Sequence, residues 1–260
     1  MTDVWEVGDA YEPYVGRWSR MVATAFVRWL GDVGEGVRWL DVGCGTGAVT
    51  ATVLAEAAPA AVAGLDPSPA FVRYAARRVA DPRAAFLVGD ATALPLLDGA
   101  VEAVVSGLVL NFVTDPARAL AEMVRVASVT VGVYVWDYAE GMGMMRAFWD
   151  AAVALEPGAA ALDEGPRFPL CRPEPLAAAF LAAGLSSVDT MPIDVPMRFR
   201  DFDDFWQPFL GGQGPAPAYA MSLPEGRRAA LRDRLRAELP YDPDGGISLT
   251  ARAWAARGTV

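Results

Sequence analysis

Apolar runs and helical patterns alternate along the first half of the chain. Residues 18–30 place apolar side chains at three- and four-residue intervals, which predicts an amphipathic helix that ends before Gly31. Short apolar runs then recur roughly every 20 residues, and each is followed by turn residues and a helical pattern. The strands predicted from these runs are residues 37–41, 60–65, 85–88, 101–110 and 129–136.

This alternation predicts an α/β fold with a parallel sheet covered on both faces. Right-handed crossovers bring the carboxyl ends of such strands to one edge, where these folds bind ligands. With two later strands, at 187–195 and 247–255, we expect a doubly wound, seven-stranded, mostly parallel sheet in a single domain. Its parts are a core of residues 31–137, 173–196 and 247–257, two helical cap inserts at 138–172 and 197–246, and an N-terminal lid helix at 10–30.

Both inserts follow strands whose ends lie at the ligand-binding edge, so we expect them to fold over the site together. The second insert carries an aromatic series from Phe199 to Phe209. The sequence leaves open whether that series packs as core or lines a pocket.

The charge and the apolar runs exclude several classes of protein. The formal net charge is −10 and no basic run occurs, which excludes nucleic acid as the expected substrate. The apolar stretch 101–113 is too short to span a bilayer, and residues 1–12 lack the apolar core of a signal peptide. We therefore expect a soluble cytoplasmic protein with no membrane partner, as a monomer or homodimer, that acts on a small-molecule acceptor.

Two residue types are missing altogether. The chain has no His, and every basic residue is Arg, so no Lys occurs either. An imidazole base, a His metal ligand and a Lys Schiff base are therefore excluded, and we expect no metal. The two cysteines have neither disulfide-framework nor metal-ligand spacing.

A glycine loop follows the first predicted strand. Asp41 lies in that strand, Gly43, Gly45 and Gly47 alternate after it, and a helical pattern begins at once. Glycine can adopt positive φ and lets a ligand touch bare backbone, while the N–H groups of the following helix point at the ligand. Because Ala48 completes a looser dinucleotide fingerprint, a nicotinamide-dependent oxidoreductase remains an alternative.

Two further acidic strand ends disfavour that alternative. Asp66 closes the second predicted strand, and Gly89-Asp90-Ala91 closes the third. In a doubly wound sheet these ends lie beside the glycine loop, where together they would line one adenosine.

In these features the chain resembles the class I S-adenosylmethionine-dependent methyltransferases, in the small-molecule, type 11-like branch. The resemblance covers about residues 10–137, and the segments 111–113 and 122–126 strengthen it. It implies a Rossmann-like fold and S-adenosylmethionine as cofactor, with S-adenosylhomocysteine as product. The cofactor-binding residues it implies are Asp41, Gly43, Cys44, Gly45, Gly47, Asp66, Pro67, Asp90, Ala91, Leu108, Asn111, Tyr14 and Arg17.

The resemblance also implies a role for most of these residues. Asp66 would accept hydrogen bonds from both ribose hydroxyls. Asp90 would accept one from the adenine amino group, and the Ala91 N–H would meet a ring nitrogen. Tyr14 and Arg17 would belong to a lid over the cofactor carboxylate, with an ordinary surface as the alternative. Cys44 is expected to be a small loop residue.

The chain departs from the family where Arg125-Val126 runs through Ala127-Ser128 directly into the next strand, without the usual Pro-Gly-Gly turn. The shortened turn lies away from the ligand-binding edge. We expect it to leave the cofactor site unaffected and to alter the register of the strand.

Methyl transfer is an in-line displacement in which the protein holds acceptor and methyl group aligned. Without His or Lys, the general base would be Asp137, with Tyr138 and Glu140 behind it. An ordinary Asp has a pKa of about 3.9, too low to deprotonate an alcohol near neutrality, so we expect an acceptor that ionises readily or an amine that is already neutral. A protein that binds the cofactor without methyl transfer, such as a cyclase on the same fold, is the alternative.

Overall fold

Seven strands among the described residues form one sheet, in the order β3-β2-β1-β4-β5-β7-β6. The computed structural model describes residues 16–31, 33–211 and 214–260. Strands β1 to β5 are parallel, and β7 runs antiparallel to both β5 and β6. The predicted mostly parallel, doubly wound sheet is confirmed. The strands are β1 (Arg38–Val42), β2 (Ala61–Asp66), β3 (Ala84–Val88), β4 (Val101–Gly107), β5 (Ala127–Trp136), β6 (Ser186–Phe199) and β7 (Ile247–Thr259).

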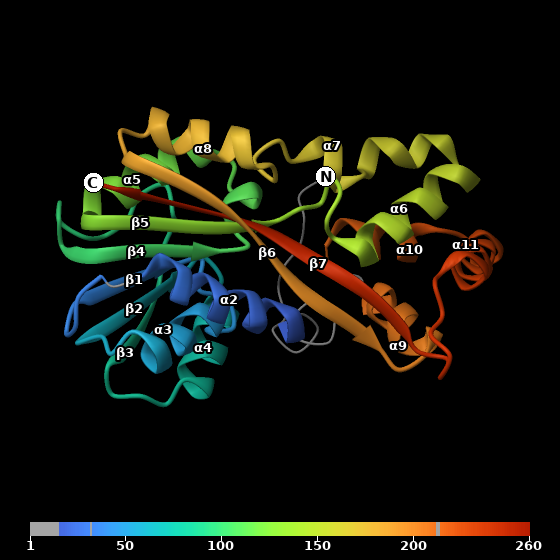
Figure 1. Ribbon diagram of the computed structural model, residues 1–260, viewed down its shortest axis with the longest axis horizontal. Helices are drawn as coiled ribbons and strands as arrows, with labels where there is room; N and C mark the ends of the chain where they lie inside the picture. Colours follow the sequence, from blue (N-terminus) through green and yellow to red (C-terminus); the bar gives the residue numbers. More distant parts are fainter. Residues whose placement is uncertain (1–15, 32, 212–213) are drawn as a thin grey trace.

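Helices cover both faces of this sheet, with α2 to α4 on one side and α5 and α8 on the other (Figure 1). No helix in the described ranges is long and apolar enough to cross a membrane. The α-helices are α2 (Arg17–Leu30), α3 (Ala48–Glu56), α4 (Pro69–Arg78), α5 (Pro116–Val126), α6 (Gly143–Leu155), α7 (Glu164–Arg167), α8 (Pro173–Ala182), α9 (Phe202–Trp206), α10 (Pro215–Ser222) and α11 (Glu225–Glu238). Short 3-10 turns are η2 (Leu110–Phe112), η3 (Pro157–Leu162) and η4 (Gln207–Gly211).

Local sequence signals set where the helices that follow β2 and β4 begin. The Ser68 hydroxyl accepts a hydrogen bond from the Phe71 N–H at 3.4 Å, and the Asp115 carboxylate accepts one from the Arg118 N–H at 2.9 Å. In each helix a proline follows the capping residue, where its missing N–H costs nothing. These helices therefore start directly at the carboxyl edge of the sheet.

Strand β4 is shorter than the apolar run that predicted it. It ends at Gly107, because Leu108 adopts a left-handed φ of 63° and cannot continue the strand. The predicted end at residue 110 is therefore wrong. The Leu108 N–H donates to the Tyr134 carbonyl at 2.7 Å, which ties this bend to the neighbouring strand β5.

The short connection between α5 and β5 leaves an irregular register. Val101 pairs with Ala127, but Ala103 pairs with Thr130, so the ladder shifts between these pairs. This irregularity lies at the amino end of β5, opposite the ligand-binding edge, and the expected alteration of strand register relative to the family stays a prediction.

Strands β6 and β7 form a long antiparallel pair that reaches beyond the rest of the sheet (Figure 1). This pair is called the hairpin below, although the second insert lies between its two strands. Both are longer than predicted, and β6 continues three residues past the predicted core boundary at 196. Helices α9, α10 and α11 lie at the far end of the hairpin, near α6 (Figure 1). The predicted division into core, inserts and lid otherwise stays a prediction.

Candidate active site

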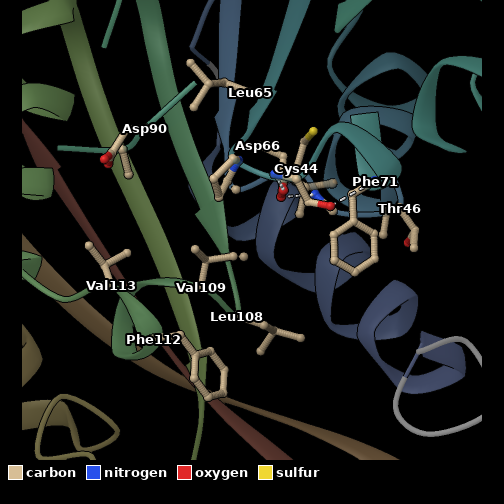
Figure 2. Close-up of a pocket in the computed structure, with 18 of the residues that line it drawn as sticks. Cys44, Thr46, Leu65, Asp66, Phe71, Asp90, Leu108, Val109, Phe112 and Val113 are labelled. Atoms are coloured by element: carbon tan, nitrogen blue, oxygen red, sulfur yellow. Dashed lines mark hydrogen bonds between the residues drawn. The ribbon is translucent and has the colours of Figure 1, made fainter. Parts of the chain in front are cut away.

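A cavity of about 780 Å³ opens at the carboxyl edge of the parallel strands. The glycine loop, the ends of β2 to β5 and Ser19 of α2 line it. Figure 2 shows Cys44, Asp66 and Phe71 close together, with Phe112 and Val113 across the cavity. All of its lining residues lie between positions 19 and 138, so the second insert contributes none of those that the structure describes.

The glycine loop needs its glycines for backbone shape and for close approach. Gly43, Gly45 and Gly47 have φ values of 74°, 50° and 82°, which other residues rarely adopt. A Cβ on Gly43 would lie 2.5 Å from a methyl group of Val109, whereas a Cβ on Gly45 would meet nothing within 4 Å. The Gly45 backbone therefore faces open space at the cavity wall.

Asp41 supports this loop from behind and does not line the cavity. Its Oδ2 accepts hydrogen bonds from the Thr50 N–H at 3.0 Å and the Thr50 hydroxyl at 2.7 Å. Burial raises the pKa of the Asp41 carboxyl to about 7, and the Thr50 bonds offset only part of that effect. The prediction that Asp41 contacts the cofactor is corrected: it holds the start of α3 in place.

Asp66 faces the cavity and is already held by two backbone groups. Its Oδ2 accepts from the Gly45 N–H at 3.0 Å, and its Oδ1 accepts from the Ser68 N–H at 2.9 Å. Each oxygen keeps a second lone pair for a ligand. Burial raises the pKa of Asp66 above its ordinary value, against the lowering effect of these two bonds. Pro67 also lines the cavity.

Asp90 and Ala91 line the cavity beside Asp66, at the end of β3. The Asp90 Oδ1 accepts from the Thr92 N–H and the Thr92 hydroxyl, both at 2.8 Å. These bonds lower the pKa of the exposed Asp90 carboxyl. The three predicted strand ends therefore do meet at one cavity.

Other predicted cofactor residues have mixed placements. Cys44 and Leu108 line the cavity, whereas Gly47 and Asn111 do not. Burial raises the pKa of the Cys44 thiol far above its ordinary value, so this residue is no reactive thiolate. Both polar atoms of the Asn111 amide are buried without a hydrogen-bond partner in the part of the chain that is described.

Arg17 turns away from the cavity. Its guanidinium lies 4.1 Å from the centroid of the Trp18 ring and 5.0 Å from that of Phe199, and its Nη1 is 3.4 Å from the Asp204 carboxylate. The predicted contact of Arg17 with the cofactor carboxylate is corrected: Arg17 joins α2 to the second insert. Tyr14, its predicted partner, lies outside the described residues.

Aromatic side chains line the opposite end of the cavity. They come from η2 and from β5 and the residues after it: Phe112, Tyr134, Trp136 and Tyr138. Phe168 of the first insert packs edge-on against Phe112 at 5.2 Å between ring centroids, and lies 5.8 Å from the Tyr138 ring. Beyond Tyr138, its first residue, the first insert therefore backs this aromatic wall without lining the cavity.

Of the three predicted catalytic residues, only Tyr138 lines the cavity. Asp137 is buried in its own turn, where its Oδ1 accepts from the Glu140 N–H at 3.0 Å. Glu140 is exposed and also lies away from the cavity. The described residues contain no group of three or more acidic or cysteine side chains placed to hold a metal ion.

Residues 40–130 match the model of a methyltransferase domain family. This segment contains the glycine loop, Asp66 and Asp90. The chain carries a methyltransferase domain of the class I, type 11 kind.

The methyltransferase domain is also the part of the chain that aligns with curated proteins. Demethylmenaquinone methyltransferase of Roseiflexus sp. (strain RS-1) is 38% identical over 92 residues, which is 35% of this chain and 39% of that protein. The chain thus spans about two fifths of the length of this relative.

Solved structures resemble a larger share of the chain, at low identity. A putative methyltransferase from an antibiotic biosynthesis pathway of Anabaena variabilis has a TM-score of 0.64 at 17% identity, covering 92% of this chain and 97% of that one. The [4+2]-cyclase SpnF has a TM-score of 0.51 at 24% identity, covering 91% and 79%. These likenesses establish a shared fold.

Sequence reasoning missed several residues at the site of the methyltransferase domain. Ser19 belongs to a helix whose pattern predicts only amphipathic packing, and Tyr134 lies within a continuous apolar strand. Neither carries a local signal for a ligand. The aromatic series of the second insert, left open between core and pocket, packs as core: Phe199, Phe205 and Phe209 are fully buried, and Phe205 contacts both of the others at 5.2 and 5.5 Å between ring centroids.

Proposed function

We propose that the chain transfers the methyl group of S-adenosylmethionine to a small apolar or aromatic acceptor. The observation that carries this proposal is one cavity with two unlike ends. Asp66, Asp90 and the open backbone of Gly45 lie at one end, and an aromatic wall lies at the other. A long ligand with a polar nucleoside and a reactive tip fits such a cavity.

The polar end fits the nucleoside of this cofactor. Both Asp66 oxygens keep a lone pair, which suits the two ribose hydroxyls. Asp90 engages Thr92 through Oδ1, so its Oδ2 is available to the adenine amino group. The missing side chain at Gly45 leaves room for the methionine portion. When bound, the cofactor would supply an electrophilic methyl group on its sulfonium.

At the aromatic end the chain's contribution is to hold the acceptor in line with that methyl group and to exclude water. Phe112 and Trp136 offer flat apolar surface, which favours an aromatic acceptor. Tyr138 is the titratable side chain there that the sequence predicted, and an ordinary phenol, with a pKa of about 10, is almost wholly protonated near neutrality and therefore cannot accept a proton. The acceptor therefore has to ionise readily or be nucleophilic as it stands.

Calorimetric titration with S-adenosylhomocysteine tests the cofactor assignment. We expect micromolar binding, and we expect Asp66→Asn to weaken it about 10- to 100-fold, because one charged acceptor of a hydroxyl is lost. Asp233→Asn is the matched control, because Asp233 is an exposed carboxylate on α11. This variant should bind S-adenosylhomocysteine as tightly as the unaltered protein does. Absence of binding to the unaltered protein would contradict the proposal.

Transfer itself is tested by a mass-spectrometric screen for products heavier by one methylene. Tight binding of S-adenosylhomocysteine without any methylated product would favour a cofactor-bound protein that performs no transfer. Titration with NADH tests the alternative that the chain is a nicotinamide-dependent oxidoreductase, and we expect NADH not to bind.

A further inference from the structure

Three charged side chains on one face of α5 hold the loop that carries Asp90. Arg118, Glu122 and Arg125 follow a four- and then a three-residue spacing, which places them on the same side of the helix. The loop joins β3 to β4 and contains no helix or strand of its own. Of the three side chains, only Arg118 lines the cavity.

Arg125 makes the most contacts with this loop. Its guanidinium donates to the Leu94 carbonyl at 3.0 Å, to the Leu96 carbonyl at 2.8 Å and to the Asp98 carboxylate at 2.8 Å. Its own carbonyl accepts from the Gly99 N–H at 2.9 Å. One side chain and its backbone thus fix the second half of the loop.

Glu122 and Arg118 hold the first half. The Glu122 carboxylate accepts from the Leu94 N–H at 2.8 Å and from Arg125 through both of its oxygens, at 2.8 Å each. The Arg118 Nε donates to the Thr92 carbonyl at 3.2 Å. Thr92 is in turn the residue whose N–H and hydroxyl hold the Asp90 carboxylate.

These bonds are charge-assisted and shielded from water on the Glu122 side. Glu122 is 7% exposed, and its contact with Arg125 lowers its pKa to about 2. Leu94 is buried and anchors the loop in the core. Asp90, by contrast, is exposed, and the described hydrogen bonds of its carboxylate both come from Thr92, so the position of that carboxylate depends on the loop.

We propose that Glu122 and Arg125 are positioning residues that set the selectivity of the cofactor site for a 6-aminopurine. They hold the loop at the register in which Asp90 faces the adenine amino group and touch no ligand themselves. This inference rests on the proposed function, because it takes the cavity to bind an adenosine. The inference gives a role to residues 122–126, a segment that supports the family resemblance but contributes no residue to the cavity lining.

The experiment compares two ligands across matched variants. S-adenosylhomocysteine carries the 6-amino group, and S-inosylhomocysteine carries a 6-oxo group in its place. Arg125→Lys keeps the positive charge but loses the planar fork that reaches both carbonyls. Arg28→Lys is the control, because Arg28 forms a comparable two-bond pair with Glu56 on helices away from the loop.

We expect the unaltered protein and Arg28→Lys to prefer S-adenosylhomocysteine by at least about tenfold in dissociation constant, the discrimination worth roughly one hydrogen bond to a charged group. In Arg125→Lys this preference should fall at least about fivefold, chiefly through weaker binding of S-adenosylhomocysteine. The KM for the methyl donor should rise, with kcat unchanged.

Equal weakening of both ligands in Arg125→Lys, with the preference intact, would overturn the inference and leave the proposed function standing. An unaltered protein that binds neither ligand would overturn both. If Arg125→Lys does not fold, Glu122→Gln supplies the same comparison, because it keeps an acceptor for the Leu94 N–H and loses the charge that holds Arg125.

Discussion

Asp41 and Asp66 are neighbouring buried carboxylates with different tasks, and the glycine loop separates them. The Oδ2 of Asp41 accepts both hydrogen bonds from Thr50, and its buried Oδ1 has no partner among the described residues. Asp66 bonds through both oxygens and still faces the cavity. The burial of an unpaired oxygen makes Asp41 a residue at which protonation state and stability are coupled.

We expect Asp41→Asn to flatten the pH dependence of stability. The folded-state pKa of about 7 lies above the ordinary value of 3.8, so between about pH 4 and 7 the folded protein retains a proton that the unfolded chain has lost. The free energy of unfolding therefore falls as pH rises through that window, by on the order of 1–3 kcal/mol. Asparagine still accepts from Thr50 and carries no charge.

Denaturant unfolding at pH 4.5 and pH 8 measures this effect. Relative to the unaltered protein, Asp41→Asn should gain stability at pH 8. Glu164, whose pKa is also raised to about 7, is the same in both proteins and cancels in the comparison. A difference between the two proteins that is the same at both pH values would show that Asp41 is charged throughout.

Residue types and spacing predicted two acidic side chains that line the cavity, Asp66 and Asp90, and the reason is local. Asp66 is the last residue of β2 and Asp90 lies two residues after β3, so strand ends alone place them. Asp137 also follows a strand, yet its carboxylate bonds to a backbone N–H three residues later. Whether an acidic side chain at a strand end faces the ligand or caps its own turn depends on backbone angles, which the sequence does not specify.

At the scale of elements, α2 connects the cavity to the hairpin of β6 and β7. Ser19 of α2 lines the cavity, while Trp18 packs on Phe199 of β6 at 5.2 Å between ring centroids. Phe199 also packs edge-on against Phe205 of α9. Helix periodicity predicted α2 closely, because one apolar stripe determines it. Its partner could not be predicted, since any apolar surface satisfies that stripe.

Phe199→Ala should destabilise the protein by about 3–5 kcal/mol, because Phe199 is fully buried where three elements meet and its loss leaves a cavity. The free energy of unfolding in denaturant measures this loss. Leu181→Ala, whose side chain is 60% exposed on α8, should change stability by less than about 0.5 kcal/mol. A loss below about 1 kcal/mol for Phe199→Ala would mean that the junction contributes little.

At the scale of the whole molecule, the cavity and the second insert are separate structures. Every described lining residue precedes position 139, and the second insert shares an aromatic core with the first at the end of the hairpin, where Phe209 stacks on Phe148 at 4.5 Å between ring centroids. The sheet was predictable because alternating strands and helices leave few arrangements. The placement of the cap was not, because it depends on how far β6 and β7 extend beyond β5.

Saturating S-adenosylhomocysteine should raise the melting temperature of the intact chain. At 100 times its dissociation constant, a ligand that binds only the folded state adds about 2.7 kcal/mol. For a chain of this size that corresponds to roughly 5–10 °C. Scanning calorimetry with NADH at the same concentration should give no shift, and equal shifts with both ligands would contradict the assignment of the cavity.

The place of β7 in the sheet has a consequence for synthesis. This strand comes last among the described elements, yet it lies between β5 and β6. Roughly 110 residues separate Trp136 from Ile247, which a ribosome translates in about 5–20 s. During that interval the nascent chain already contains every described residue that lines the cavity, while the edge of β5 that pairs with β7 has no neighbouring strand. Until β7 is made, that edge is open to pairing with another strand, so the order of synthesis makes β5 the exposed edge of the growing sheet.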